Sequence, residues 1–129
     1  MRRFVISIFL LLLIVIGYLI ITKPHVSVVD AHYDGRTGQV IVDKLPFLES
    51  DKISWWNESK ENIMRKYNIP SGQNTPFLIT IYAFGDGYKE EEEEDRRCFQ
   101  NIKPPKNCID KNIIMSITRR RDGSVNYDF

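Results

Sequence analysis

A run of 18 residues without a charged side chain, residues 4–21, constrains this 129-residue chain more than any other feature. As an α-helix the run would be about 27 Å long, because each residue adds about 1.5 Å, and this length approaches the hydrocarbon thickness of a bilayer. Inside a bilayer the backbone has no water to bond, so a helix is the expected conformation. The sequence therefore predicts one N-terminal transmembrane helix.

A cleaved signal peptide is the alternative interpretation of this run. Signal peptides have shorter apolar runs, of about 7–15 residues, and small residues before the cleavage site. Here bulky residues precede Thr22, and no cysteine follows the run to carry a lipid. We therefore favour an uncleaved anchor over residues 1–23, followed by a separate domain over residues 24–129.

The residues that flank the run predict its orientation. Arg2 and Arg3 precede it, whereas only Lys23 follows it closely. Positive flanking residues tend to stay in the cytoplasm. We therefore expect a single-pass protein of a bacterial inner membrane, with a short cytoplasmic N-terminus and residues 24–129 in the periplasm.

The charge balance argues against one class of partner. The chain has 18 Lys and Arg residues against 17 Asp and Glu residues, and every acidic residue follows position 24. Because part of the positive charge flanks the apolar run, the domain itself is mildly acidic. Such a domain has no long-range attraction for phosphate backbones, so we do not expect nucleic-acid binding.

Cys98 and Cys108 are the only cysteines in the chain, and nine residues separate them. Two cysteines in a small domain outside the cytoplasm are typical of a disulfide, which would stabilise this domain by about 2.5–3 kcal/mol. A metal site would need further ligands, and His25 and His32 are distant in sequence. A redox pair prefers a spacing of two residues. We predict a structural disulfide, with neither a metal nor a cofactor.

Hydrophobic patterns predict the elements of the domain. In chain order these are strands over residues 26–33 and 39–45, a helix from Ser50 or Asp51 to about Tyr67, and strands over residues 76–84, 113–118 and 125–129. Residues 34–38 and 122–123 are rich in turn-forming residues. The fold class is therefore α+β, with a mainly antiparallel sheet packed on one helix.

The predicted helix has one apolar face and one unusual tryptophan. At 100° per residue the apolar face consists of Ile53, Trp56, Ile63, Met64 and Tyr67. Trp55 points roughly to the opposite side of the helix. A large aromatic residue on a polar face is a candidate contact for a protein partner. The alternative is that Trp55 packs beneath the acidic loop or against the connection between strands.

Six consecutive acidic residues, Glu90–Asp95, form the most charged segment. Such a run could meet a basic partner or bind a divalent cation, but calcium loops space their ligands around a sharp turn, and this run does not. We expect a solvated loop, with Glu91, Glu92 and Glu93 as candidate partner contacts.

The sequence gives little support for catalysis. Asp86 lies between two glycines, where it is either a reactive carboxylate or part of an ordinary turn, and we favour the turn. No Ser or Cys lies in a recognisable nucleophile turn, and the chain has no glycine-rich phosphate loop. His25 and His32 would face opposite sides of one strand. We therefore predict that the protein is not an enzyme, and a hydrolase that uses Asp86 is the less favoured interpretation.

Several short segments resemble a known family. They are Lys52–Trp56, Lys66–Pro70, Phe84–Lys89, Asp95–Phe99 and Asn107–Asn112. With these segments the chain, from the anchor to about Thr118, resembles an uncharacterised family of enterobacterial membrane proteins with one N-terminal membrane helix. The resemblance implies a membrane-anchored protein of unknown biochemical role and supplies no catalytic residue.

The combined pattern favours a binding function. A small domain tethered to the inner membrane, with an acidic loop and no catalytic constellation, is typical of a protein that binds another protein, for example an immunity protein or an inhibitor. An accessory or assembly factor of an envelope complex, in which the membrane helix itself makes contacts, is the alternative. Architecture alone does not distinguish the two.

Overall fold

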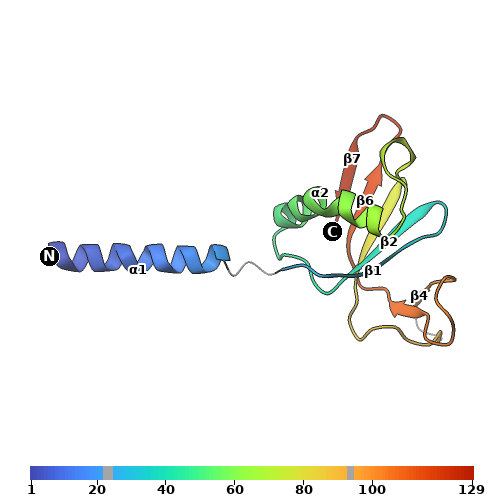
Figure 1. The fold of residues 1–129 in the computed structure, drawn as a ribbon, viewed down its shortest axis with the longest axis horizontal. Helices are drawn as coiled ribbons and strands as arrows, with labels where there is room; N and C mark the ends of the chain where they lie inside the picture. Colours follow the sequence, from blue (N-terminus) through green and yellow to red (C-terminus); the bar gives the residue numbers. More distant parts are fainter. Residues whose placement is uncertain (22–24, 93–94) are drawn as a thin grey trace.

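The computed structural model describes residues 1–21, 25–92 and 95–129, and it begins with helix α1 (Arg2–Ile21), which lies outside the domain in Figure 1. The side chains of α1 are described as far as Tyr18, and its apolar side chains from Phe4 to Ile16 are between 46% and 71% exposed. Within the described residues, no helix is both long enough and apolar enough to cross a membrane. Residues 22 and 23, the end of the predicted anchor, lie outside the described residues.

A five-stranded sheet forms the centre of the domain. Its strands, in spatial order, are β1 (Val28–Tyr33), β2 (Thr37–Val42), β3 (Leu78–Ala83), β6 (Ile113–Arg119) and β7 (Val125–Asp128). Three of the four strand pairs are antiparallel, which confirms the predicted α+β class. The pair β2–β3 is parallel, and this was not predicted. It arises because the long connection between these strands contains a helix and returns the chain to the end of the sheet at which β2 begins.

Helix α2 (Glu49–Lys66) covers one face of the sheet (Figure 1). Its buried residues are Trp56, Ile63 and Met64, which confirms the predicted apolar face. The predicted cap at Ser50 or Asp51 is wrong, because the helix is capped at Leu48 without a side-chain hydrogen bond. The acidic side chains of its first turn, Glu49 and Asp51, instead lie next to the positive end of the helix dipole.

The second face of the sheet carries a small unit that was not predicted. Strands β4 (Arg96–Cys98) and β5 (Cys108–Asp110) pair with each other in an antiparallel ladder. Each strand has only three residues, too few for an alternating pattern to be visible in sequence. Together with the sheet this unit buries a separate apolar cluster of Ile41, Tyr82, Phe99 and Ile109. We call it the disulfide unit.

The two ends of the sheet differ in their distance from α1 along the chain. Strand β1 starts at Val28, soon after α1, and reaches Tyr33 about 17–20 Å further on. We call the end with Val28 and its partner Val42 the proximal end, and the end with Tyr33 and Thr37 the distal end. The short helix η1 (Gly72–Asn74) lies close to the distal end, because Arg119 of β6 binds its Gly72 carbonyl at 3.2 Å.

Candidate functional site

A groove of about 760 Å³ opens at the distal end, between the β1–β2 turn and the disulfide unit. We call it the distal groove, and its lining consists of residues 32–36, Gln39 and residues 97–101. Alternation along the strands explains which side chains reach it. Ala31 and Val40 point to the core under α2, so His32 and Gln39 point to the opposite face, where they are register partners.

His32 lies at the centre of a buried polar network. Its Nε2 is 3.1 Å from the hydroxyl of Tyr88, which donates to the carboxylate of Asp30 at 2.5 Å. The side-chain amide of Asn101 donates to His32 Nδ1 at 2.9 Å, so the proton of the neutral ring belongs on Nε2. Phe99 stacks on the ring, with centroids 3.9 Å apart. The network joins β1 to the loop before β4 and to the loop between β4 and β5.

Burial and hydrogen bonding keep the His32 ring and the Tyr88 hydroxyl of this network uncharged. Burial lowers the pKa of His32 below 6.5, and the Asp30 carboxylate only partly opposes this effect. Burial, together with the hydrogen bond to Asp30, raises the pKa of the Tyr88 hydroxyl. At neutral pH His32 is therefore uncharged and Tyr88 is protonated, which suits them to position neighbouring groups.

Arg97 supplies one of the two positive charges that line the distal groove, and the exposed Arg36 supplies the other. Arg97 Nη2 is 3.2 Å from Asp34 Oδ2, and the Arg97 guanidinium lies 5.9 Å from the centre of the Phe99 ring. Burial raises the pKa of Asp34, but hydrogen bonds from the Thr37 and Arg36 amides and the Thr37 hydroxyl outweigh it and lower the pKa to about 2. Asp34 is therefore ionised and holds Arg97 at the rim of the groove.

Two buried polar atoms at this groove are unpaired. Within the described residues, neither Gln39 Oε1 nor Arg97 Nε has a hydrogen-bond partner. Gln39 is only 4% exposed, and its amide nitrogen already donates to Thr37 at 2.7 Å. Buried polar atoms are nearly always paired, and an unpaired one costs about 1–3 kcal/mol. Both atoms are inaccessible to solvent as the side chains stand, so they offer one acceptor and one donor to an entering molecule only after the Gln39 and Arg97 side chains turn toward it.

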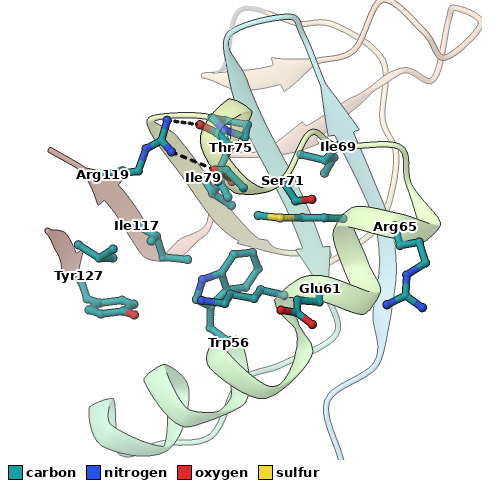
Figure 2. Close-up of a pocket in the computed structure, with 15 residues that line it drawn as sticks. Trp56, Glu61, Arg65, Ile69, Ser71, Thr75, Ile79, Ile117, Arg119 and Tyr127 are labelled. Atoms are coloured by element: carbon teal, nitrogen blue, oxygen red, sulfur yellow. Dashed lines mark hydrogen bonds between the residues drawn. The ribbon is translucent and has the colours of Figure 1, made fainter. Parts of the chain in front are cut away.

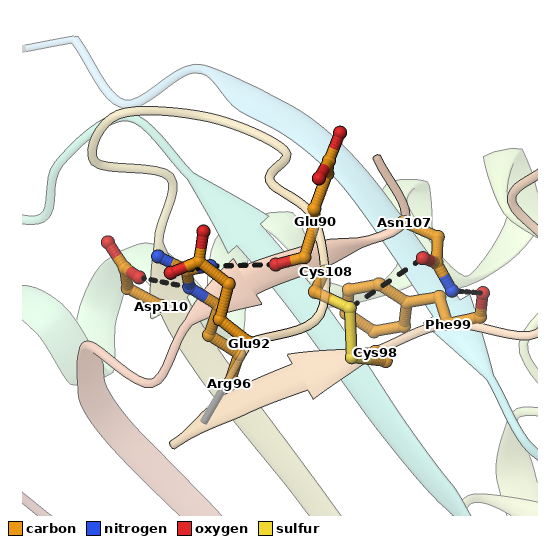
Figure 3. The surroundings of a disulfide bond; sticks show 8 residues. All are labelled: Glu90, Glu92, Arg96, Cys98, Phe99, Asn107, Cys108 and Asp110. Carbon is orange, nitrogen blue, oxygen red and sulfur yellow. Dashed lines mark hydrogen bonds and ion pairs between the residues drawn. A yellow bond between two sulfur atoms is a disulfide. The ribbon is translucent and has the colours of Figure 1, made fainter. Parts of the chain in front are cut away.

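The predicted disulfide between Cys98 and Cys108 is present and ties β4 to β5 (Figure 3). Beside it, Asp110 accepts from Arg96 at 3.1 Å and from Lys89 at 2.8 Å. Because Phe99 directly follows Cys98, the disulfide also restrains the ring that stacks on His32. The bond is thus part of the support of the distal groove.

Comparison with known proteins gives a family. Residues 1–129 match the family described as "Enterobacterial putative membrane protein (DUF943)". The chain belongs to this family. The resemblance inferred from the sequence is confirmed, and the family description adds a membrane context without an activity. No curated protein and no solved structure matches the chain.

The described residues of the acidic run of this DUF943 protein lie outside the distal groove. Glu91 and Glu92 are exposed, and Glu92 Oε2 is 3.5 Å from Arg96 Nη1 (Figure 3). Glu93, the third predicted contact, lies outside the described residues. The role of these carboxylates in partner binding stays a prediction.

Trp55 lies at the proximal end. It is half-buried, packs against the core under α2, and lines a cavity with His25, Val26 and Pro46. It does not project freely from the polar side of the helix, because its ring is half-buried against the core. Its role as a partner contact stays a prediction, and the structure supports packing against a strand connection.

Asp86 and the histidines do not form a reactive cluster with each other. The Asp86 side chain is 83% exposed and lies 3.3 Å from Lys89 Nζ, in the turn that follows β3. His25 is exposed, whereas His32 belongs to the buried network. Within the part of the chain that the structure describes, no group of three or more His, Cys, Asp or Glu side chains could hold a metal ion.

A second groove lies between α2 and strands β6 and β7 (Figure 2). Its floor consists of side chains of the main core, including Trp56, Ile79 and Ile117. On its rim the Arg119 guanidinium binds the carbonyl of Thr75 at 2.7 Å. This groove is a surface of the core, and Arg119, one of the three cationic residues that line it, is already engaged.

The distal groove was not predicted, because its parts are far apart in the chain. His32 is separated from Tyr88 by 56 positions and from Asn101 by 69. The sequence offered one signal of this site. Strand alternation places His32 and Gln39 on a buried face, and buried polar side chains need polar partners. It could have indicated a polar site, but not its members.

Proposed function

We propose that this protein is a single-pass inner-membrane protein that holds residues 24–129 in the periplasm and binds another protein through the distal groove. The observation that carries this proposal is the pair of unpaired buried atoms, Gln39 Oε1 and Arg97 Nε, at one groove. A partner that supplied the missing donor and acceptor would remove the cost of leaving them buried.

The sequence of α1 supports the anchor. Residues 4–21 carry no charge, and the described apolar side chains of this helix are turned outward, where lipid would cover them. Membership in a family of membrane proteins agrees with this assignment. Arg2 and Arg3 favour a cytoplasmic N-terminus, and the disulfide suits the oxidising periplasm.

The position of the groove supports access by a partner. Strand β1 leads from the proximal to the distal end, so the distal groove opens at the end of the sheet that is further from α1 along the chain. A protein tethered by α1 would therefore present this groove to the aqueous compartment. Tyr33, which is 39% exposed, adds an aromatic surface at the rim.

The chemistry of the two atoms fits a peptide group. A main-chain N–H of the partner would donate to Gln39 Oε1, and a nearby main-chain carbonyl would accept from Arg97 Nε. Every peptide unit offers this donor and acceptor. An immunity protein or inhibitor is one form of such a binding protein, in which the captured partner is the toxin or enzyme that it neutralises.

Crosslinking in intact envelopes tests the proposal. A photo-reactive amino acid at Gln100, an exposed residue of the groove, is compared with the same group at Asn62, an exposed residue of α2. The protein carries a C-terminal tag, and unreduced gels report the disulfide. We expect one stoichiometric partner from position 100, none from position 62, and loss of the partner in Gln39→Leu.

Two results would contradict this proposal. One is equal capture from both positions, and the other is no capture although the protein is in the membrane with its disulfide formed. Capture that is lost in Trp55→Ala or Glu91→Gln but retained in Gln39→Leu would move the interface to the surfaces predicted from sequence and away from the groove.

An envelope assembly factor that uses its helix is the second candidate, and the outward apolar surface of α1 favours it. Replacement of residues 1–23 by an unrelated anchor separates the two functions. A protein that binds through the groove should retain its partner after the replacement, whereas an assembly factor should lose it. Asp86→Asn should leave either function unchanged, and loss of function with the fold intact would revive the hydrolase interpretation.

A further inference from the structure

Two large apolar side chains of the domain are left uncovered in the loop before α2. Phe47 is 94% exposed and Leu48 is 58% exposed, which makes Phe47 the most exposed of the large apolar residues described in the domain. We call residues 43–48 the proximal loop. An apolar pair at the tip of a loop is well suited to contact another surface.

Hydrogen bonds tie this loop to the start of the domain. The backbone N–H of Asp43 donates to the carbonyl of Ser27 at 3.0 Å, and the Ser27 N–H donates to the Asp43 carboxylate at 2.8 Å. Further along the loop, Pro46 lines the same cavity as His25 and Val26. Phe47 directly follows Pro46, so it lies close to residues 25–27, which lead into β1.

The covalent chain limits how far this loop can lie from the end of α1. His25 follows Ile21, the last residue of α1, by only four residues. Four residues span at most about 13–14 Å, even when fully extended. If α1 spans a membrane, the segment beside the proximal loop therefore stays within about 14 Å of the point where the helix leaves the bilayer.

We infer that Phe47 and Leu48 insert into the surface of the membrane from which α1 emerges, and so hold the domain against the lipid. This inference rests on the anchor in the proposed function. Aromatic and aliphatic side chains that are held close to a membrane surface enter the boundary between headgroups and acyl chains. Lys44 is exposed in the same loop, but Glu49 and Asp51 follow it closely. The contact is therefore apolar, and neutral lipids suffice for it.

Depth-dependent quenching on the full chain tests the inference. The protein is reconstituted into phosphatidylcholine vesicles, with Phe47→Cys labelled by an environment-sensitive fluorophore and lipids that carry a quencher near the headgroup. The native cysteines are joined in the disulfide, so the introduced thiol is the one that reacts. Phe77→Cys is the matched control, because Phe77 is 53% exposed and precedes Leu78, the partner of Thr37 at the distal end.

We expect the label at position 47 to lose at least half of its emission to the quencher, whereas the label at position 77 loses little. Equal or absent quenching at the two positions overturns the inference. Unquenched but blue-shifted emission at position 47 also overturns it, because a second protein copy then covers the loop. Flotation of the same vesicles reports the anchor separately. A chain that fails to float contradicts the proposed anchor, whereas a floating chain with an unquenched label contradicts only the lipid contact.

Discussion

The two faces of the central sheet are stabilised in different ways. Under α2 the cluster of eleven buried residues is apolar throughout. The opposite face has a cluster of only four, and it also carries His32, Gln39 and Thr80, the buried polar side chains identified in the described residues. One face thus depends on burial alone, whereas the other combines a small apolar cluster with hydrogen bonds and a disulfide.

This difference indicates which face is available for function. The interface under α2 is already covered by the helix, and within the described residues it has no unpaired buried polar atom. The second face has unpaired atoms and a network that fixes aromatic side chains around them. Its disulfide offsets the stability that a smaller core cannot supply.

The largest effect should come from the apolar face. Trp56 is 3% exposed at the centre of the α2 interface, and Trp56→Ala should lower the free energy of unfolding by about 3–5 kcal/mol. Trp55→Ala, at the half-buried neighbour, should lower the free energy of unfolding by clearly less. Urea unfolding of the full chain in detergent measures both variants. Equal losses of unfolding free energy in the two variants would contradict the different burial of the two rings. If Trp56→Ala does not fold, Trp56→Leu is measured in its place.

Loss of the disulfide should have the next largest effect, confined to the second face. The bond closes a loop with a sequence separation of 10, which corresponds to about 2.5–3 kcal/mol. In the double variant Cys98→Ser, Cys108→Ser we expect faster hydrogen exchange in β4, β5 and the distal groove, while α2 stays protected. Uniform loss of protection over both faces would show that they unfold as one unit.

Mild acid should also weaken the second face selectively. Because the pKa of His32 is lowered in the folded state, the unfolded chain binds more protons as the pH falls through 6.5, and stability decreases. His32→Gln, which keeps a hydrogen-bonding side chain without this titration, should flatten the decline between pH 7.5 and 5.5. The control is His25→Gln, at an exposed site, which should keep the wild-type slope. If His32→Gln left the dependence of stability on pH unchanged, His32 would not be the group responsible for the loss of stability in acid.

The acidic loop should contribute least to stability. Glu92 makes an exposed ion pair with Arg96, and we expect Glu92→Gln to change the free energy of unfolding by less than about 0.5 kcal/mol. Glu91→Gln, at the exposed neighbour, is the matched control and should have a still smaller effect. A larger loss in either variant would mean that the loop supports the disulfide unit, and denaturant unfolding would detect it.

Much of the fold followed from local patterns, and most of the candidate site did not. The apolar pattern along residues 76–84 correctly predicted the strand β3, whose Ile79 and Ile81 lie in the core under α2 and whose Tyr82 lies in the cluster under the disulfide unit. For Trp55 the alternative of packing agrees with the structure, because the half-buried ring packs against the core under α2, whereas periodicity alone placed it on the opposite side of the helix. The disulfide unit was missed because its strands are too short to show a period.

The sequence by itself determined the features that depend on a few neighbouring residues: the uncharged run of α1, the apolar face of α2, the alternation of the strands and, from two cysteines alone, the disulfide. The tertiary structure decided the parallel pairing of β2 with β3 and the convergence of Asp30, His32, Tyr88 and Asn101. The physical reason is separation along the chain. Periodicity reports which face a side chain takes, but the order in which strands pair determines which distant side chains share that face.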